Sequence, residues 1–76
     1  MEDTFHQKLS PGDLVYIRDW DVVNSRWVTY KDRVFLVVDA KRDPSDEKFK
    51  RDIVSVVHNE FPLIESYAGY FVKVNV

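Results

Sequence analysis

Few side chains in this sequence have the types and spacings that carry catalysis. The two histidines, His6 and His58, are isolated, and neither belongs to a metal-ligand spacing such as H-x-x-x-H. The two glycines, Gly12 and Gly69, are too far apart to build a glycine-rich loop around a phosphate. The chain has no cysteine, which rules out a disulfide scaffold and the usual structural zinc sites. We therefore expect a protein that is not an enzyme and that holds no cofactor and no metal.

One series of carboxylates has a spacing close to that of a calcium-binding loop. Asp39, Asp43 and Glu47 follow one another at intervals of four residues. However, Lys41 replaces the second ligand of such a loop, and Lys50 stands where its bidentate glutamate belongs. The sequence therefore argues against a calcium site here.

Aromatic residues in two connecting segments, residues 19–32 and 66–70, are the stronger functional signal. Tyrosine and tryptophan bring large, rigid contact areas, and binding hot spots are enriched in them. The alternative is that these rings fill a thin core or pin a long connection to the body. On the first interpretation, the two segments meet in space and form a partner-binding surface. Its candidate residues are Trp20, Trp27, Tyr30, Tyr67 and Tyr70.

The segment of residues 41–52 is charged, with five basic and four acidic side chains. Its basic residues could contact phosphates, and they are Lys41, Arg42, Lys48, Lys50 and Arg51. A nucleic-acid-binding protein would use these together with Arg26 and Arg33. Interleaved opposite charges nevertheless favour a solvated loop whose field largely cancels. The net charge of −2 also disfavours a nucleic-acid partner, because such proteins usually carry excess positive charge.

Length and composition limit the architecture. A chain of 76 residues makes one small domain with a thin core. With 45% hydrophobic and 14% aromatic residues, the chain is not of the disordered type. No stretch reaches the roughly 20 apolar residues of a membrane span, and the N-terminus does not resemble a signal peptide. We expect a cytoplasmic protein with no membrane partner.

Short apolar runs separated by turn signals predict an all-β protein with five strands. The expected strands are residues 14–17, 33–40, 53–58, a short one beginning at Phe61, and 71–76. A turn cluster at residues 10–13 opens the first strand, and Pro62 favours an edge position or the start of a strand. Residues 19–32 are expected to be a long connection, in which residues 27–30 could pair as a short hairpin arm. Residues 66–70 are expected to form a short turn of 3-10 helix.

Strand periodicity also predicts the core. The run of five apolar residues at 34–38 indicates a strand buried on both faces or bending through the core. The core residues we expect are Val15, Ile17, Val34, Leu36, Val38, Val54, Val56, Phe71 and Val74. Residues 1–8 are expected to be a flexible N-terminal arm, with residues 9–76 forming the domain.

Two stretches of the sequence carry a family resemblance. "PGDLVYI" at residues 11–17 resembles the entry strand of small SH3-like barrels, and "SYAGYFVKV" at residues 66–74 resembles their closing segment. The resemblance implies a five-stranded SH3-like barrel with a long first loop and a 3-10 turn before the last strand. In peptide-binding members of this class, aromatic residues of that loop and turn line a shallow groove.

The chain is also similar to small uncharacterised proteins of tailed phages, especially those of cyanobacteria. That resemblance implies a non-enzymatic interaction module that binds a protein partner, in this case a protein in the host cytoplasm. Two alternatives remain open: a nucleic-acid-binding small barrel, and a structural component of a phage particle. The resemblance transfers no catalytic residue, and the oligomeric state stays open.

Overall fold

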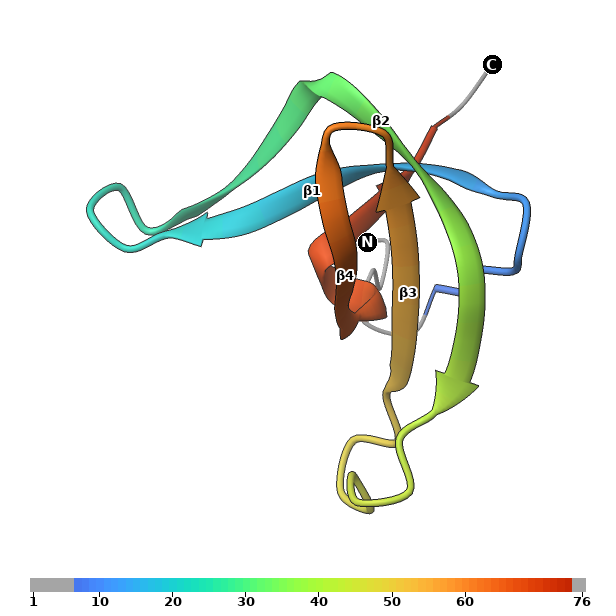
Figure 1. Ribbon diagram of the computed structural model, residues 1–76. Coiled ribbons are helices and arrows are strands. Elements are labelled where there is room, and N and C mark those ends of the chain that lie inside the picture. The colour runs from blue at the N-terminus through green and yellow to red at the C-terminus, as the bar shows by residue number, and fades with distance from the viewer. Residues whose placement is uncertain (1–6, 75–76) are drawn as a thin grey trace.

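The computed structural model describes residues 7–74, which form one five-stranded antiparallel sheet and a 3-10 turn (Figure 1). The elements are β1 (Leu14–Asp21), β2 (Arg26–Arg42), β3 (Asp52–His58), β4 (Phe61–Tyr67), the 3-10 turn η2 (Ala68–Tyr70) and β5 (Phe71–Lys73). The strand order in the sheet is β4-β3-β2-β1-β5. The predictions of an all-β chain and of a 3-10 turn before the last strand are confirmed.

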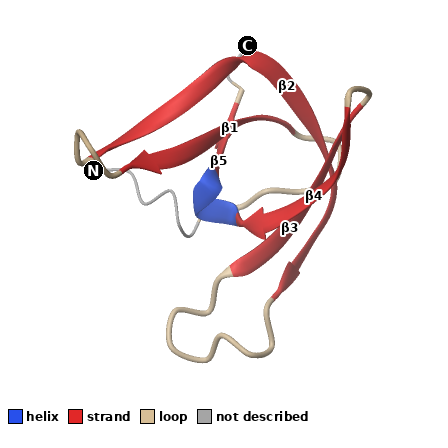
Figure 2. Ribbon diagram, turned by 60° about the vertical axis from the view of Figure 1, so that its left-hand side comes forward, coloured by secondary structure: helices blue, strands red, loops and turns tan. Residues whose placement is uncertain are grey.

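The sheet is not closed into a barrel. Within residues 7–74, β4 pairs only with β3, and β5 pairs only with β1. The connection between the two edge strands is η2 itself, which crosses the open side (Figure 2). Pro62 lies in the edge strand β4, as predicted from its missing backbone donor.

The sheet folds over because β2 is long and bends. Its first part pairs with β1, from Arg26 opposite Asp21 to Tyr30 opposite Ile17. Its last part pairs with β3, and the curved ribbon is visible in Figure 2. Between these parts the register shifts. Ile17 lies opposite Tyr30, whereas Val15, two residues earlier in β1, lies opposite Phe35, five residues later in β2. Irregularities of this kind bend a strand and increase its twist, which allows one sheet to enclose a core.

The expectation of a long loop at residues 19–32 is wrong in form, whereas the pairing of residues 27–30 as a hairpin arm is confirmed. The segment consists of the end of β1, a tight turn and the start of β2, so the residues pair as a regular two-stranded hairpin. At its tip, Oδ1 of Asp21 accepts hydrogen bonds from the amides of Val23 and Asn24 at 3.1 and 3.3 Å. Ser25 takes a φ of 50°. We call residues 18–30 the hairpin arm, which projects from the body in Figure 1.

Among the described residues, the core is a cluster of eight buried side chains, namely Leu9, Val15, Phe35, Val37, Val54, Val56, Ala68 and Phe71. Four of these were predicted, and Ile17 packs against the cluster while only partly buried. Burial of this apolar surface is the main force that holds the sheet together.

The predicted register of β2 is wrong. Val34, Leu36 and Val38 are 41%, 40% and 43% exposed, whereas Phe35 and Val37 point inward at 5% and 1%. A run of five apolar residues gives no alternation, so its sequence does not say which residues face the core. Val74 is also outside the core, since it follows β5 and is half-buried.

The N-terminal turn holds the first described residues against the sheet. Oδ2 of Asp13 accepts a 2.8 Å hydrogen bond from the amide of Ser10, and Gly12 has a φ of 98°, as the predicted turn cluster requires. Gln7 Nε2 donates to the carbonyls of Ala68 and Phe71. The rest of the expected arm, residues 1–6, lies outside the described residues. None of the helical segments within residues 7–74 is long and apolar enough to cross a membrane.

Candidate functional site

The hairpin arm and η2 meet through their aromatic rings. The rings of Trp20 and Trp27 pack edge to face across the arm, with centroids 5.6 Å apart. The ring of Trp27 packs in the same way on Tyr70 of η2, also at 5.6 Å. Edge-to-face pairs at this distance are a preferred and stabilising geometry. The expected meeting of segments 19–32 and 66–70 is therefore confirmed, although the arm is a hairpin and not a loop.

Arg18 fixes the arm to η2. Its guanidinium carbon lies 4.0 Å from the centroid of the Trp27 ring, and its Nε donates a hydrogen bond to the carbonyl of Gly69. The residue is only 9% exposed, and burial lowers the pKa of its guanidinium. A cation stacked on a tryptophan face and bonded to a backbone carbonyl orients both groups. Arg18 is thus a positioning residue for the aromatic cluster.

An open groove lies beside this cluster. It has a volume of about 330 Å³ and lies between the paired strands β1 and β2 on one side and β4 and η2 on the other. Its walls are Ile17, Arg18, Asp19, Tyr30, Ile64, Ser66, Tyr70 and Phe71. A second hollow of about 210 Å³ shares Ile17, Tyr30 and Ile64 with it, so the two form one depression along β4. We call this depression the aromatic groove.

The chemistry of the aromatic groove suits an extended chain better than a small molecule. Tyr30 is 52% exposed at its edge, and Trp20 is 44% exposed nearby on the arm. The groove is shallow and open, whereas small-molecule sites usually enclose most of their ligand. The carboxylate of Asp19 at one end accepts only the amide of its neighbour Trp20 among the described hydrogen bonds. It adds a negative charge next to the positive charge of Arg18 on a mainly apolar surface.

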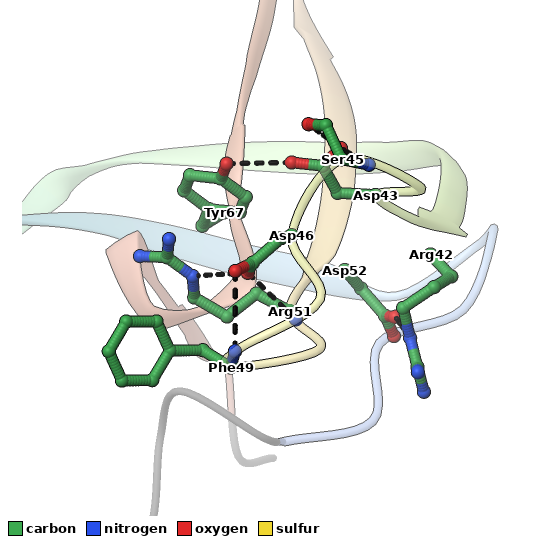
Figure 3. A network of polar contacts seen from close by, with 8 residues as sticks. All are labelled: Arg42, Asp43, Ser45, Asp46, Phe49, Arg51, Asp52 and Tyr67. Atoms are coloured by element: carbon green, nitrogen blue, oxygen red, sulfur yellow. Dashed lines mark hydrogen bonds and ion pairs between the residues drawn. The ribbon is translucent and has the colours of Figure 1, made fainter.

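Tyr67, another of the predicted contact residues, belongs to a different arrangement (Figure 3). Its hydroxyl donates a 2.7 Å hydrogen bond to Oδ2 of Asp43. The guanidinium carbon of Arg51 lies 3.9 Å from the centroid of the Tyr67 ring. The structure therefore brings Trp20, Trp27 and Tyr70 together, and Tyr30 and Tyr70 line the same groove. Tyr67 instead anchors the loop of residues 43–51.

The same loop is held by hydrogen bonds to two carboxylates. Oδ1 of Asp43 accepts from both the hydroxyl and the amide of Ser45, at 2.7 and 3.0 Å. Oδ2 of Asp46 accepts from Nε and the amide of Arg51, at 2.7 and 3.1 Å. The bond from the Ser45 side chain lowers the pKa of Asp43, and the bond from the Arg51 side chain lowers that of Asp46. The hydrogen bond that the Tyr67 hydroxyl donates to Asp43 raises the pKa of Tyr67.

Several cations of the proposed phosphate-binding set are engaged with carboxylates. Arg51 pairs with Asp46, and Nε of Arg42 lies 3.3 Å from Oδ1 of Asp52. Arg33 contacts both Asp32 and Glu60. These pairs support the interpretation of the charged segment as a self-neutralising loop. Within residues 7–74, no group of three acidic or histidine side chains is arranged to hold a metal ion.

Sequence reasoning missed two residues of this site. Arg18 is a charged residue inside a strand, and nothing in its neighbours indicates that Gly69 and Trp27 lie beside it. Ile64 was placed in a short strand without a role, whereas it lines both parts of the groove. Comparisons with protein-family models, curated proteins and solved structures found no match to this chain.

Proposed function

We propose that this protein is a non-enzymatic binding module that captures an extended segment of a protein partner in the aromatic groove. The observation that carries the proposal is the contact between Trp27 of the hairpin arm and Tyr70 of η2. It brings residues from two distant segments to one surface, next to a groove with exposed tyrosine and tryptophan rings. Rigid aromatic anchors of this kind supply much of the binding energy in protein interfaces.

We further propose that the fold is an open variant of the SH3-like barrel. The strand order β4-β3-β2-β1-β5 and the 3-10 turn between the two edge strands support this assignment. The resemblance to phage proteins that the sequence suggested is itself a proposal, and with it the partner would be a protein of the infected host. The argument for binding stands on the groove and does not depend on either assignment.

The proposal is tested by selecting peptides from a random displayed library on the purified protein and measuring their affinity by calorimetry. Tyr30→Ala and Trp20→Ala each remove an exposed ring, so the fold should persist. We expect each to weaken the selected peptides by about tenfold or more, the range of an interface anchor.

Phe49→Ala is the matched control, because Phe49 is an aromatic residue with 51% exposure on the loop of residues 43–51. It should leave the peptide affinity unchanged. A library that yields no binder, or binders that tolerate both Tyr30→Ala and Trp20→Ala, would contradict the proposed function.

A further inference from the structure

One edge of β4 has no strand beside it within residues 7–74. β3 pairs with one side of β4, from Ile53 opposite Tyr67 to His58 opposite Phe61, and no strand of this part of the chain pairs with the other side. The backbone hydrogen bonds outside the strand ladders join other segments. An unpaired edge presents a row of N–H and C=O groups to which another extended chain can pair.

The outer edge of β4 has few of the features that protect edge strands. Natural edges are protected by proline, bulges or charged side chains, especially lysine. In β4, Pro62 and the irregular pairing lie at the start of the strand, and residues 63–67 contain one charged side chain, that of Glu65. The other edge strand, β5, is three residues long and ends at Lys73, whose Nζ lies 3.6 Å from Oδ2 of Asp13. Of the two edges, that of β4 is therefore the more open to pairing.

The aromatic groove lies along the same strand. Ile64 and Ser66 of β4 line it, and Ile17 and Tyr30 form the facing wall. Because β3 occupies one edge of β4, a chain that lies in the groove along β4 runs beside the unpaired edge. Paired strands lie about 4.8 Å apart, and alternate side chains of an added strand point to the same face. An added strand can therefore pair with β4 and direct every second side chain into the groove.

We propose that the partner segment binds as an additional strand, hydrogen-bonded through its backbone to residues 63–67 of β4. This inference rests on the proposed function and specifies the conformation and the chemistry of the ligand. The partner segment is extended, has no proline where its N–H groups face β4, and carries apolar side chains at alternate positions. In this mode of recognition, the backbone hydrogen bonds supply affinity and the alternate side chains supply specificity.

Glu65 adds a charge requirement. Its side chain is exposed, and its neighbour across the ladder with β3 is the uncharged Ser55. Successive residues of a strand point to opposite faces, so Glu65 lies on the face of β4 opposite to Ile64 and Ser66. An added strand has side chains on both faces, and opposite charges directly across a ladder stabilise it. We therefore expect lysine or arginine opposite Glu65 in the partner segment.

A second copy of this chain fits the edge less well than such a segment does. Two β4 strands paired antiparallel over residues 63–67 place Glu65 opposite its own copy, and like charges directly opposite destabilise a ladder. Each copy also brings Pro62, which has no N–H to donate. A segment of another protein with a basic residue opposite Glu65 meets neither obstacle.

Amide hydrogen exchange measured by NMR tests the pairing. The probe is the linear peptide selected from the displayed library. In the free protein, the amides of residues 63–67 that β3 leaves unpaired should exchange fast, and they should alternate along the strand. Peptide at a free concentration about tenfold above its dissociation constant should slow these amides by about tenfold, the limit set by occupancy.

N-methylation of the peptide gives a control within one ligand. Methyl groups on the alternate amides that face β4 remove hydrogen-bond donors, and they should weaken binding by about tenfold or more. Methyl groups on the intervening amides point away from β4 and should change the affinity by less than about twofold. Losses of affinity that do not alternate along the peptide would contradict the added strand.

Glu65→Lys tests the charge requirement and should stay folded, because Glu65 is exposed. It should weaken the peptide about fivefold through repulsion of the basic residue opposite. Glu47→Lys is the matched control, since it makes the same change of charge at an exposed residue of the loop of residues 43–51. It should bind like the wild type.

The outcomes separate this inference from the proposed function. A peptide that binds while the amides of β4 exchange as fast as in the free protein would overturn the added strand and leave the proposed function standing. An affinity unchanged by Glu65→Lys would do the same. Protection of these amides that rises with protein concentration in the absence of peptide would assign the edge to a second copy and also overturn the inference. A library without any binder contradicts the proposed function and this inference together.

Discussion

The hydroxyl of Tyr67 donates a 2.7 Å hydrogen bond to Oδ2 of Asp43, a residue 24 positions earlier in the chain. This bond joins β4 to the loop of residues 43–51. The guanidinium of Arg51, from the same loop, stacks on the Tyr67 ring. Asp43 is only 6% exposed, so water replaces a lost partner poorly.

Tyr67→Phe is therefore expected to lower the urea midpoint of unfolding and to speed hydrogen exchange in residues 43–51. The ring and its contact with Arg51 remain, so the change isolates the hydroxyl. Tyr30→Phe is the matched control, because Tyr30 is 52% exposed on the hairpin arm. Equal midpoints for Tyr67→Phe and the wild type would show that the bond does not hold the loop.

The same network predicts a dependence of stability on pH. The pKa of Asp43 and that of Asp46 lie below the ordinary value of 3.8 in the folded protein, because of hydrogen bonds to Ser45 and Arg51. The stability they contribute is thus present above that ordinary value and lost as the pH falls through the folded pKa. For Tyr67 the pKa is raised above 10.0, so its contribution is present below that value and lost as the pH rises through the folded pKa.

Urea midpoints measured from neutral to acidic pH should therefore fall steeply only in strong acid. Asp43→Asn should flatten this acid limb, because the amide cannot titrate. Asp39→Asn, at an exposed carboxylate of β2, is the control and should retain the steep limb. Identical acid limbs in the wild type and Asp43→Asn would contradict the assignment.

Neighbouring valines of β2 test its register. Val37 is 1% exposed in the core and Val38 is 43% exposed on the outer face. Val37→Ala should cost about 2 kcal/mol of unfolding free energy, through lost burial and a small cavity. Val38→Ala should cost well under about 1 kcal/mol. Urea denaturation of the two variants gives the comparison, and equal losses would show that the strand is placed one residue out of register.

The tip of the hairpin arm contains a strained residue. Ser25 takes a φ of 50°, a left-handed conformation that residues with a side chain adopt at a cost. Ser25→Gly should raise the unfolding free energy by up to about 1 kcal/mol, because glycine adopts this conformation without that cost. Ser25→Val should lower it, since a branched side chain tolerates positive φ poorly. The reverse order of thermal midpoints for these two variants would rule out the turn described here.

The sequence predicted the strands and the closing 3-10 turn because their signals are local. Proline, glycine and aspartate mark the turn at residues 10–13, and alternating or β-branched residues mark the strands. The phase of β2 could not be predicted, since Val34 to Val38 are all apolar and the register shifts on either side of them. The hairpin arm was predicted only as a short pairing of residues 27–30, and its full regular form was missed because its turn uses Asp21 and Ser25 in place of glycine or proline.

The candidate site was predictable only in part. Aromatic composition pointed to Trp20, Trp27 and Tyr70, and topology explains why two distant segments could meet. The position of Tyr67 depends on Asp43, and that of Trp27 depends on Arg18. Such pairings join residues far apart in the chain and leave no local pattern.

The most direct test of the account is to map a library-selected peptide on the protein by ¹⁵N and ¹³C NMR titration. We predict shift changes at the amides of Tyr30, Ile64 and Tyr70 and at the indole of Trp20, which surround the aromatic groove. Changes confined to the outer face of β2 and β3 or to residues 43–51 would contradict the claim that the hairpin arm and η2 form the binding surface.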